Sequence, residues 1–505
     1  MFFYDLNLKS NYKLSDKDRF YLSGYFGRDK FKFSELFGLS WGNSTATLRW
    51  NHVYGDKLFS NISLIYSDFD YGVEFKFADN AYFGSTQGFK DYNLKVDFSN
   101  YFKPGNKLSF GGQVIHHKFN PGEFKALNEE TEETIGRTSI QLENKRALES
   151  AVYVDHEWKK NARYNFRYGM RISMFNNLGK STEYTYAKDE FNKPFATDTS
   201  TFGNNEIYNT NIGFEPRASF SYNLTTQSAL KASYNRTYQY IQQASNSATT
   251  LPVDQWFPSN VNVEPQLADQ IAIGYFRNFD DLGLEVSLEA YHKVMQNQID
   301  YRDGASLFFN EQLDGELLFG KARSTGLELY VQKNKGKFTG FIAYTLSATR
   351  RKLDEINRGD WYVDNNDRPH SLSLVGTYNF SDRVSLSGTF SYVSGKAFTS
   401  PVSSYIYDGK RLAIYGDRNN DRVPAYHRAD IGLNLKNKEK EGKRLKSSWN
   451  FSVYNFYARE NPFVVNFEEV KIENDEGEEI ANGQTQAVQI ALFKLIPSVT
   501  WNFEF

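Results

Sequence analysis

The sequence predicts an all-β protein, an antiparallel transmembrane β-barrel in which about 19 strands are present. Three observations predict this fold class. Apolar and polar residues alternate with period two, many alternating stretches last about 10 to 14 residues where strands of soluble sandwiches average about five or six, and short and long connections follow one another in strict order.

The alternation that predicts the strands is clear in NIGFEPRASFSYNL, residues 211–224. Phe214 lies on an apolar face, whereas Glu215 and Arg217 lie on the opposite, wholly polar face. The stretch LEVSLEAYHKV, residues 284–294, repeats the pattern, as do YDLNLKSNYKL, NFRYGMRISMF, SLSLVGTYNF and VSLSGTFSYV. We expect the apolar face of each strand to meet lipid and the polar face to meet the lumen.

The connections predict which rim of the barrel faces outward. Short turns such as LSDKDR, KPGNK, NLTTQS, NFDDLG, NKGK and NFSDR follow every odd strand, and long connections follow every even one. In bacterial outer-membrane barrels the short turns face the periplasm and the long loops face outward. The long connections cover roughly residues 28–42, 120–144, 177–209, 242–264, 297–320, 397–423 and 459–486.

The last strand, FKLIPSVTWNFEF at residues 493–505, carries an apolar residue at every second position. We interpret this stripe as the lipid face of the final strand. Trp501, Phe503 and Phe505 are predicted to lie at the periplasmic interface, where aromatic rings settle, and to act as the signal for membrane assembly.

Composition excludes several classes of protein. The 505 residues are 17% aromatic and 24% charged, with a mean hydropathy of -0.61, and no apolar run approaches the roughly 18 residues of a spanning helix. A formal net charge of -2 gives no basic surface for nucleic acid. The absence of cysteine excludes disulfides and Cys-ligated metals.

The parity of the strands predicts that the barrel is incomplete. If the last strand descends to the periplasm, every odd strand descends, and the first strand begins at the outer rim. Single-chain bacterial barrels have even strand numbers. We therefore expect one barrel domain over residues 1–505, with the first strands lying upstream of Met1, where strand-like sequence begins without a signal peptide.

Several stretches resemble the barrel of TonB-dependent outer-membrane receptors, particularly those of the Bacteroidetes type. They are ARSTGLELYVQ (322–332), DNNDRPHSLSLVGTYNF (364–380), YGDRNNDRVPAYHRADIGLNL (415–435), NFSVYNFYARENPF (450–463) and the final strand. The likeness spans the chain and is sharpest over its last 190 or so residues. It implies a barrel of about 22 strands filled by an N-terminal plug, both plug and first strands being absent here.

The resemblance also implies a function. Such receptors sit in the cell outer membrane, bind a scarce or bulky solute with the outer loops, and admit it when TonB pulls on the plug. No cofactor is implied. The implied partners are outer-membrane lipid, TonB through the absent plug, the barrel-assembly machinery and, in some related importers, a surface lipoprotein.

Aromatic residues of the long connections are the candidates for ligand binding. Rings in a cup above a polar channel can stack on sugars or planar chelators, although they can equally pack the loops together or form the outer girdle. The candidates are Tyr238, Tyr240, Trp256, Phe257, Tyr405, Tyr407 and Tyr415.

Charged residues on the polar strand faces are the candidates for the lumen wall. We expect them to neutralise one another or to hydrogen-bond to a plug, more than to contact a substrate. They are Arg167, Arg171, Glu215, Arg217, Glu285, Glu289 and Glu328.

Metal binding and catalysis find little support. The adjacent His116 and His117 point to opposite faces of a strand and cannot chelate one ion together. DRNND, residues 417–421, has the carboxylate spacing of a calcium loop, but Arg422 stands where the turn needs Gly, so a polar turn held by Asp and Arg side chains is favoured. The acidic runs at 128–133 and 473–479 indicate solvated loops.

Two other functional classes remain as alternatives. An outer-membrane hydrolase would need a strained nucleophile motif such as G-x-S-x-G, which the sequence lacks, so no enzyme is predicted. A passive porin would share the strand pattern but usually has fewer strands and a shorter chain. Sequence upstream of Met1 would separate a porin from a receptor.

Overall fold

The computed structural model describes residues 2–33, 37–78, 81–128, 134–244, 255–306, 310–408, 410–438, 446–473, 479–491 and 493–504. The main sheet of this part of the chain has 21 strands, of which β7 and β20 are short additions at the rim, so that 19 long strands form the wall. The prediction of an all-β antiparallel barrel with about 19 strands is therefore confirmed.

The long strands pair antiparallel in chain order. They are β1 (Phe2–Lys13), β2 (Asp18–Phe33), β3 (Phe37–Val53), β4 (Leu58–Ala78), β5 (Ala81–Lys103), β6 (Asn106–Asn128), β8 (Lys145–Lys159), β9 (Tyr164–Leu178), β12 (Ile207–Asn223), β13 (Ser228–Gln239), β16 (Gln266–Phe279), β17 (Leu284–Tyr301), β18 (Leu317–Lys333), β19 (Phe338–Leu353), β21 (His370–Asn379), β22 (Val384–Val393), β27 (Tyr426–Lys436), β28 (Lys446–Tyr454) and β31 (Ile496–Glu504).

The remaining elements lie in the long connections. They are β7 (Thr134–Gln141), β10 (Ser181–Lys188), β11 (Pro194–Phe202), β14 (Ile241–Ala244), β15 (Gln255–Pro258), β20 (Tyr362–Val363), β23 (Ala397–Phe398), β24 (Pro401–Tyr407), β25 (Lys410–Tyr415), β26 (Asp421–Arg422), β29 (Val464–Glu473) and β30 (Glu479–Ile490), with the short 3-10 turns η1 (Leu313–Glu316) and η2 (Asn357–Gly359). Among the described residues, no helix has the length and apolar character needed to cross a lipid bilayer.

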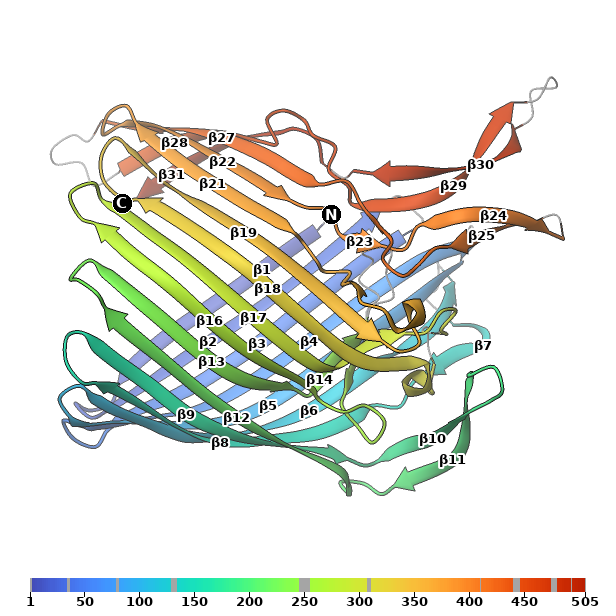
Figure 1. Cartoon of the computed structure of the whole chain (residues 1–505), viewed down its shortest axis with the longest axis horizontal. Helices are drawn as coiled ribbons and strands as arrows, with labels where there is room; N and C mark the ends of the chain where they lie inside the picture. Colours follow the sequence, from blue (N-terminus) through green and yellow to red (C-terminus); the bar gives the residue numbers. More distant parts are fainter. Residues whose placement is uncertain are drawn as a thin grey trace.

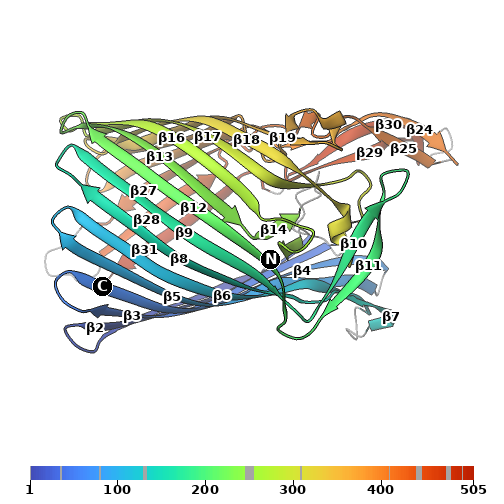
Figure 2. The same ribbon diagram turned by 60° about the horizontal axis from the view of Figure 1, so that its bottom comes forward.

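The two rims differ as the connections predict. In Figure 1 the short turns gather at the left end of the slanted strands, and the long connections gather at the right. Figure 2 shows the same separation after rotation, with the hairpins β10–β11, β24–β25 and β29–β30 extending beyond the wall. We call these two ends the short-turn rim and the long-loop rim.

Several connections expected to be loops contain strand instead. β2 and β3 pair up to Phe33 and Phe37, inside the range 28–42 that the sequence marks as a long connection. β6 continues to Asn128 in the same way. Antiparallel pairing satisfies the backbone groups of these segments above the lipid, where both faces meet water and the period-two signal is lost.

The two faces of the wall have opposite character. On β8, Val152 and Val154 are 62% and 45% exposed and point outward, whereas Asp155 on the other face is only 5% exposed. Tyr153, two residues before Asp155 on the same face, donates to Asp97, which lines a cavity on the inner side of the wall. The outward apolar face is the one expected to contact lipid.

The ends of the sheet carry one neighbour each. Within the described residues, β1 pairs only with β2, and β31 pairs only with β28. On β31, the Trp501 ring stacks on the Trp449 ring of β28, with ring centroids 5.9 Å apart. The centroid of the Phe503 ring lies 4.9 Å from that of Trp501. Phe505 lies outside the described residues, and the assembly role of this aromatic end stays a prediction.

The buried apolar clusters lie toward the long-loop rim, where loops pack on strand ends. One contains Phe119, Ala147, Phe175 and Tyr240; a second contains Phe257, Val263, Tyr301, Leu313 and Leu317; a third contains Leu318, Leu353, Ile356 and Tyr362. Burial of these side chains holds the inward-folded loops against the strand ends. The loops held in this way form the walls of the functional site described below.

Candidate functional site: a polar cup at the long-loop rim

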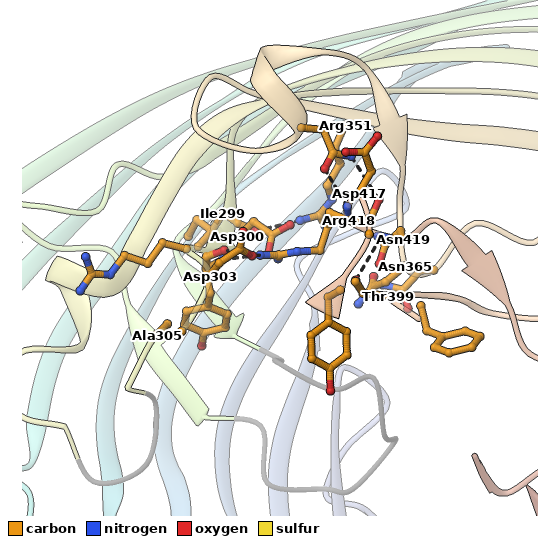
Figure 3. A pocket seen from close by; sticks show the side chains of 18 of the residues that line it. Ile299, Asp300, Asp303, Ala305, Arg351, Asn365, Thr399, Asp417, Arg418 and Asn419 are labelled. Atoms are coloured by element: carbon orange, nitrogen blue, oxygen red, sulfur yellow. Dashed lines mark hydrogen bonds and ion pairs between the residues drawn. The ribbon is translucent and has the colours of Figure 1, made fainter. Parts of the chain in front are cut away.

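A cavity of about 760 Å³ lies at the long-loop rim. Its wall combines the end of β17 and the loop after it, Arg351 from β19, the segment around η2, and the DRNND loop at 417–421. Figure 3 shows side chains from these separate connections pointing into one space. We call this cavity the cup; its lining includes Asp300, Asp303, Asn365, Asn366, Tyr415 and Asp417.

Arg418 ties the two sides of the cup together. Its guanidinium lies 2.8 Å from Asp300 and 2.6 Å from Asp303, and it donates to the Tyr301 carbonyl at 3.0 Å. Figure 3 shows the side chain reaching across to these carboxylates. Burial opposes the charge on Arg418, but the two carboxylates raise its pKa above the ordinary value, so the guanidinium stays protonated.

A second buried arginine supports the same wall. Arg351 of β19 forms an ion pair with Asp364 and donates to the Ile299 carbonyl at 2.7 Å. The Tyr362 hydroxyl donates to Asp300 at 2.7 Å. Each buried charge therefore has a partner, as a low-dielectric site requires.

The stretch DNNDR (364–368) and the DRNND loop (417–421), with the adjacent Arg422, hold these connections to one another. Arg422 forms an ion pair with Asp367 and donates to the Gly395 carbonyl at 3.0 Å. Asn357 accepts from the Arg418 backbone N–H at 2.7 Å, and Asn419 donates to the Val363 carbonyl at 2.7 Å. The prediction of a polar turn held by Asp and Arg side chains is thus confirmed for DRNND.

Amide and aromatic groups give the cup its chemistry. Asn365, Asn366 and Gln243 line it with hydrogen-bonding amides, and Tyr415 is 60% exposed. Arg358 and Asp417 form a looser pair at 3.3 Å whose members are largely exposed. The cup can hold a polar solute through amides and a stacked ring, with most of its guanidiniums already neutralised.

The predicted aromatic residues separate into three places. Tyr415 lines the cup, while Tyr405 and Tyr407 are exposed on the hairpin β24–β25. Tyr240 and Phe257 are buried in apolar clusters and hold the hairpin β14–β15 inside the wall.

The remaining two aromatics lie beside that hairpin. Tyr238 stacks on Tyr240 with ring centroids 6.3 Å apart, and the ring centroids of Trp256 and of Phe89 on β5 are 5.9 Å apart. Both are partly buried. Of the seven aromatic candidates, the structure therefore brings Tyr415 alone into the lining of the cup.

The charged residues predicted for the lumen wall form pairs across strands. Arg171 lies 3.3 Å from Glu149 and 3.6 Å from Glu215. Arg167 and Arg217 lie 2.7 and 3.3 Å from Asp155. These side chains share the face of the buried Asp155, opposite the exposed valines of β8.

The three other acidic candidates lie closer to the short-turn rim. Glu289 of β17 is directly opposite Glu328 of β18, and Glu285 accepts from Asn334 at 2.9 Å. Glu289 also lines an inner-face cavity of about 400 Å³ together with Arg167 and Lys231.

Sequence reasoning missed the buried charges of the cup. Asp300, Arg351, Asp364 and Arg418 were not singled out, although the last two lie within the DNNDR and DRNND stretches that carry the family resemblance. Asp300 lies at the end of β17, within the range 297–320 that the sequence marks as a long connection, and no local pattern distinguishes it from other charged residues of such connections. In the described ranges, no group of three or more His, Asp or Glu residues could hold a metal ion.

A wall of 19 long strands with short turns at one rim, loops folded over a polar cup at the other, and an apolar outer face defines an outer-membrane transport barrel. Residues 2–456 match the family model described as TonB dependent receptor-like, beta-barrel. The chain belongs to this family, and it is an outer-membrane protein.

Solved structures agree with this assignment. The chain is similar to the ferric-catecholate import receptor Fiu of E. coli in its closed form, with a TM-score of 0.61, 13% identity, and coverage of 99% of this chain and 74% of Fiu. It is similar to the copper transporter OprC with a TM-score of 0.65 and 12% identity, over 99% of this chain and 71% of OprC. It is similar to the ferric yersiniabactin uptake receptor FyuA from Yersinia pestis with a TM-score of 0.61 and 12% identity, over 100% of this chain and 71% of FyuA. At these identities the likeness concerns the fold.

The family model and the similar solved structures distinguish between the receptor, the passive porin and the enzyme as functional classes. They are transport receptors, not enzymes, and they favour an outer-membrane receptor over the passive porin. A search of curated proteins finds no match to the chain.

Proposed function

We propose that this receptor captures a scarce or bulky polar solute in the cup and imports it through the lumen. The cup carries the proposal: it is a cavity of about 760 Å³ built from fixed loops at the outer rim, in the size range of small-molecule sites, about 300 to 1,000 Å³. Fixed loops favour capture because little ordering remains to be done on binding.

Similar structures and the chemistry of the cup both bear on the nature of the solute. The similar structures carry titles that name ferric-catecholate import, ferric yersiniabactin uptake and copper transport. Iron chelates, vitamins, oligosaccharides and peptides all need a receptor of this kind because they are too large or too scarce for porins. The amides and Tyr415 of the cup support a polar solute with a flat face.

We also propose that further strands and an N-terminal plug complete the barrel around residues 1–505. The outer edge of β1 and that of β31 lack partners in the described residues, and unpaired backbone groups in lipid cost several kcal/mol each. About three more strands would give the even number of about 22. The polar inner wall, with Arg171 and Glu215, supports a polar plug against it.

The proposed partners follow from this arrangement. TonB would act through the plug, and the barrel-assembly machinery would read the aromatic end of β31. A surface lipoprotein is supported by the hairpin β24–β25, which leaves Tyr405 and Tyr407 exposed beyond the wall. The Bacteroidetes type rests on the segments at 364–380 and 415–435.

Two measurements test the proposal. The intact mass of the protein extracted from native outer membranes should exceed 58.4 kDa if strands and a plug accompany this barrel. Uptake of labelled candidate solutes should stop when TonB is deleted or the proton gradient is collapsed. Uptake that continues unchanged without TonB would establish passive transport instead.

A further inference from the structure

Another cavity lies on the outward face of the wall, away from the cup. It has a volume of about 520 Å³ and is lined by Phe102, Leu108, Val154, His156, Tyr168 and Met170. These residues come from β5, β6, β8 and β9, near the strand ends at the short-turn rim. We call this cavity the outer groove.

The groove opens on the lipid side of the barrel. Val154, Tyr168 and Met170 are 45%, 51% and 37% exposed, on the strand faces opposite Asp155 and Arg167. Leu108 of β6, His156 of β8 and Tyr168 of β9 lie side by side in the strand register. The groove is therefore an apolar depression in a wall that faces hydrocarbon.

The one histidine of the groove is satisfied within the protein. His156 Nδ1 lies 2.8 Å from the Tyr168 hydroxyl, and Nε2 lies 3.3 Å from Asn106 Oδ1. The imidazole also packs against Phe102 and Tyr168, at 5.7 and 5.3 Å between ring centroids. Because both ring nitrogens have partners, the groove presents rings and aliphatic groups to its occupant.

A concentration of positive charge lies at the short-turn rim, in the two turns that connect the strands of the groove. The two adjacent turns, with sequences FKPGNKL (102–108) and EWKKNARY (157–164), contain five basic residues and one acidic residue. The Lys159 N–H donates to the Gly105 carbonyl at 2.7 Å, so the two turns are held together. The five are Lys103, Lys107, Lys159, Lys160 and Arg163.

Most of these basic residues lack a carboxylate partner among the residues that the structure describes. Lys159 lies 3.3 Å from the single acidic residue, Glu157, and Lys107 lies over the Tyr101 ring at 5.5 Å. In the described part of the chain, Lys103, Lys160 and Arg163 have no carboxylate within ion-pair distance, and all three are exposed. An apolar groove bordered by free cations matches an amphiphile with an anionic head.

We propose that the outer groove and the two turns bind an anionic phospholipid of the periplasmic leaflet. The acyl chain would lie along Leu108, Val154 and Met170, and the phosphate would contact Lys103, Lys160 and Arg163. Short turns of an outer-membrane barrel face the periplasm, which places these cations at the headgroups of that leaflet. The site is separate from solute capture and does not depend on the proposed function.

Native mass spectrometry of the detergent-purified full chain tests this, with phosphatidylglycerol and phosphatidylethanolamine of identical acyl chains as probes. The wild type should bind phosphatidylglycerol at least tenfold more tightly, since each basic residue near a lipid surface adds up to roughly a factor of five in affinity for anionic lipid and three such residues border the groove. Equal binding of the two lipids would overturn the proposal.

Two matched pairs of variants locate the site. Lys103→Gln, Lys160→Gln and Arg163→Gln together should abolish the preference, whereas Lys333→Gln, Lys335→Gln and Lys337→Gln, in another short turn, should keep it. Val154→Trp fills the groove and should weaken both lipids several-fold, while Val152→Trp, two residues away on the same outward face, should not.

Heat-modifiability on gels verifies that each variant barrel is folded. If the triple variant of residues 103, 160 and 163 does not fold, the lipid preference of the wild type and the comparison of Val154→Trp with Val152→Trp still decide the question. Equal loss of preference in both triple variants, or unchanged lipid binding in Val154→Trp, would refute the site.

Discussion

Arg418 and Asp300 are 118 residues apart in the sequence, yet the guanidinium Nη1 and the carboxylate Oδ1 lie 2.8 Å apart at the centre of the cup wall. Both side chains are more than four-fifths buried. The contact joins the end of β17 to the DRNND loop and so fixes the shape of the cup from two distant parts of the chain.

Replacing Arg418 with Ala should loosen this wall. Asp300 would keep a buried charge that accepts hydrogen bonds from the Tyr362 hydroxyl and the Tyr301 N–H but has lost the Arg418 cation, and breaking a buried pair costs about 3 to 5 kcal/mol. Hydrogen exchange should become faster at residues 357–366 and 415–422 without faster exchange in the long strands.

The control for this change is Arg358→Ala. Arg358 and Asp417 are largely exposed and 3.3 Å apart, so their ion pair is worth about 0 to 1 kcal/mol. If Arg358→Ala accelerated exchange as much as Arg418→Ala, burial of the Arg418 pair would not be what holds the cup together.

The fold could be predicted from the sequence because each strand repeats a local rule. Phe214 and Glu215 fall on opposite faces wherever the strand is placed, and the turn lengths give the direction of each strand. The cup could not be predicted in this way, because Asp300, Asp364 and Arg418 acquire their roles only when three connections fold over the same rim. The same limit explains Tyr240, whose aromatic character fits ligand stacking and burial equally well until its neighbour Phe175 is known.

The Tyr240 ring should be the main anchor of the hairpin β14–β15. It stacks on Phe175 with centroids 5.0 Å apart, and its hydroxyl shares a hydrogen bond of 2.7 Å with Ser173. Tyr240→Ala should cost about 3 to 5 kcal/mol, the usual loss for removing a large buried aromatic side chain. Limited proteolysis should then cut faster within residues 241–244 and 255–258, whereas Tyr238→Ala, which removes a partly exposed ring, should leave the cutting of these residues unchanged.

Tyr415 should contribute to solute binding if the cup is the capture site. An exposed ring that stacks on a solute contributes about 0.5 to 1.5 kcal/mol, so Tyr415→Ala should weaken binding roughly three- to tenfold. Tyr407→Ala, on the same hairpin but outside the cup lining, serves as the control in the same binding assay. Equal weakening by both variants would place the solute on the hairpin surface.

Asp314 should make the packing of the outer loops depend on pH. It is partly buried in η1, where desolvation and the nearby charge of Glu183 raise its pKa, although Asn260 donates to it at 2.8 Å. A carboxyl group with a raised folded-state pKa stabilises the fold most when protonated. The loops should therefore be tightest in acid and should loosen as pH rises through the raised pKa.

Asp314→Asn tests the cause of this dependence. The amide keeps the shape and an acceptor oxygen for Asn260 but has no charge to desolvate, so loop protection should become independent of pH over the range in which the wild type changes. Proteolysis rates at residues 302–306 and 260–265, measured from pH 4 to 8, give the comparison. A variant that follows the wild-type profile would assign the pH dependence to another group.

The aromatic end of β31 should govern membrane assembly more than final stability. Trp501 faces Trp449 across the strand pair, and such a cross-strand contact is worth only about 0.2 to 1 kcal/mol in the folded sheet. Trp501→Ala combined with Phe503→Ala should thus reduce the yield of heat-modifiable protein in outer membranes severely, while the fraction that inserts should unfold at nearly the wild-type temperature. Trp449→Ala provides the control, because it removes the same ring stack without changing the terminal strand. A comparable loss of yield in Trp449→Ala would show that the stack itself, and not the terminal aromatic pattern, is needed for assembly.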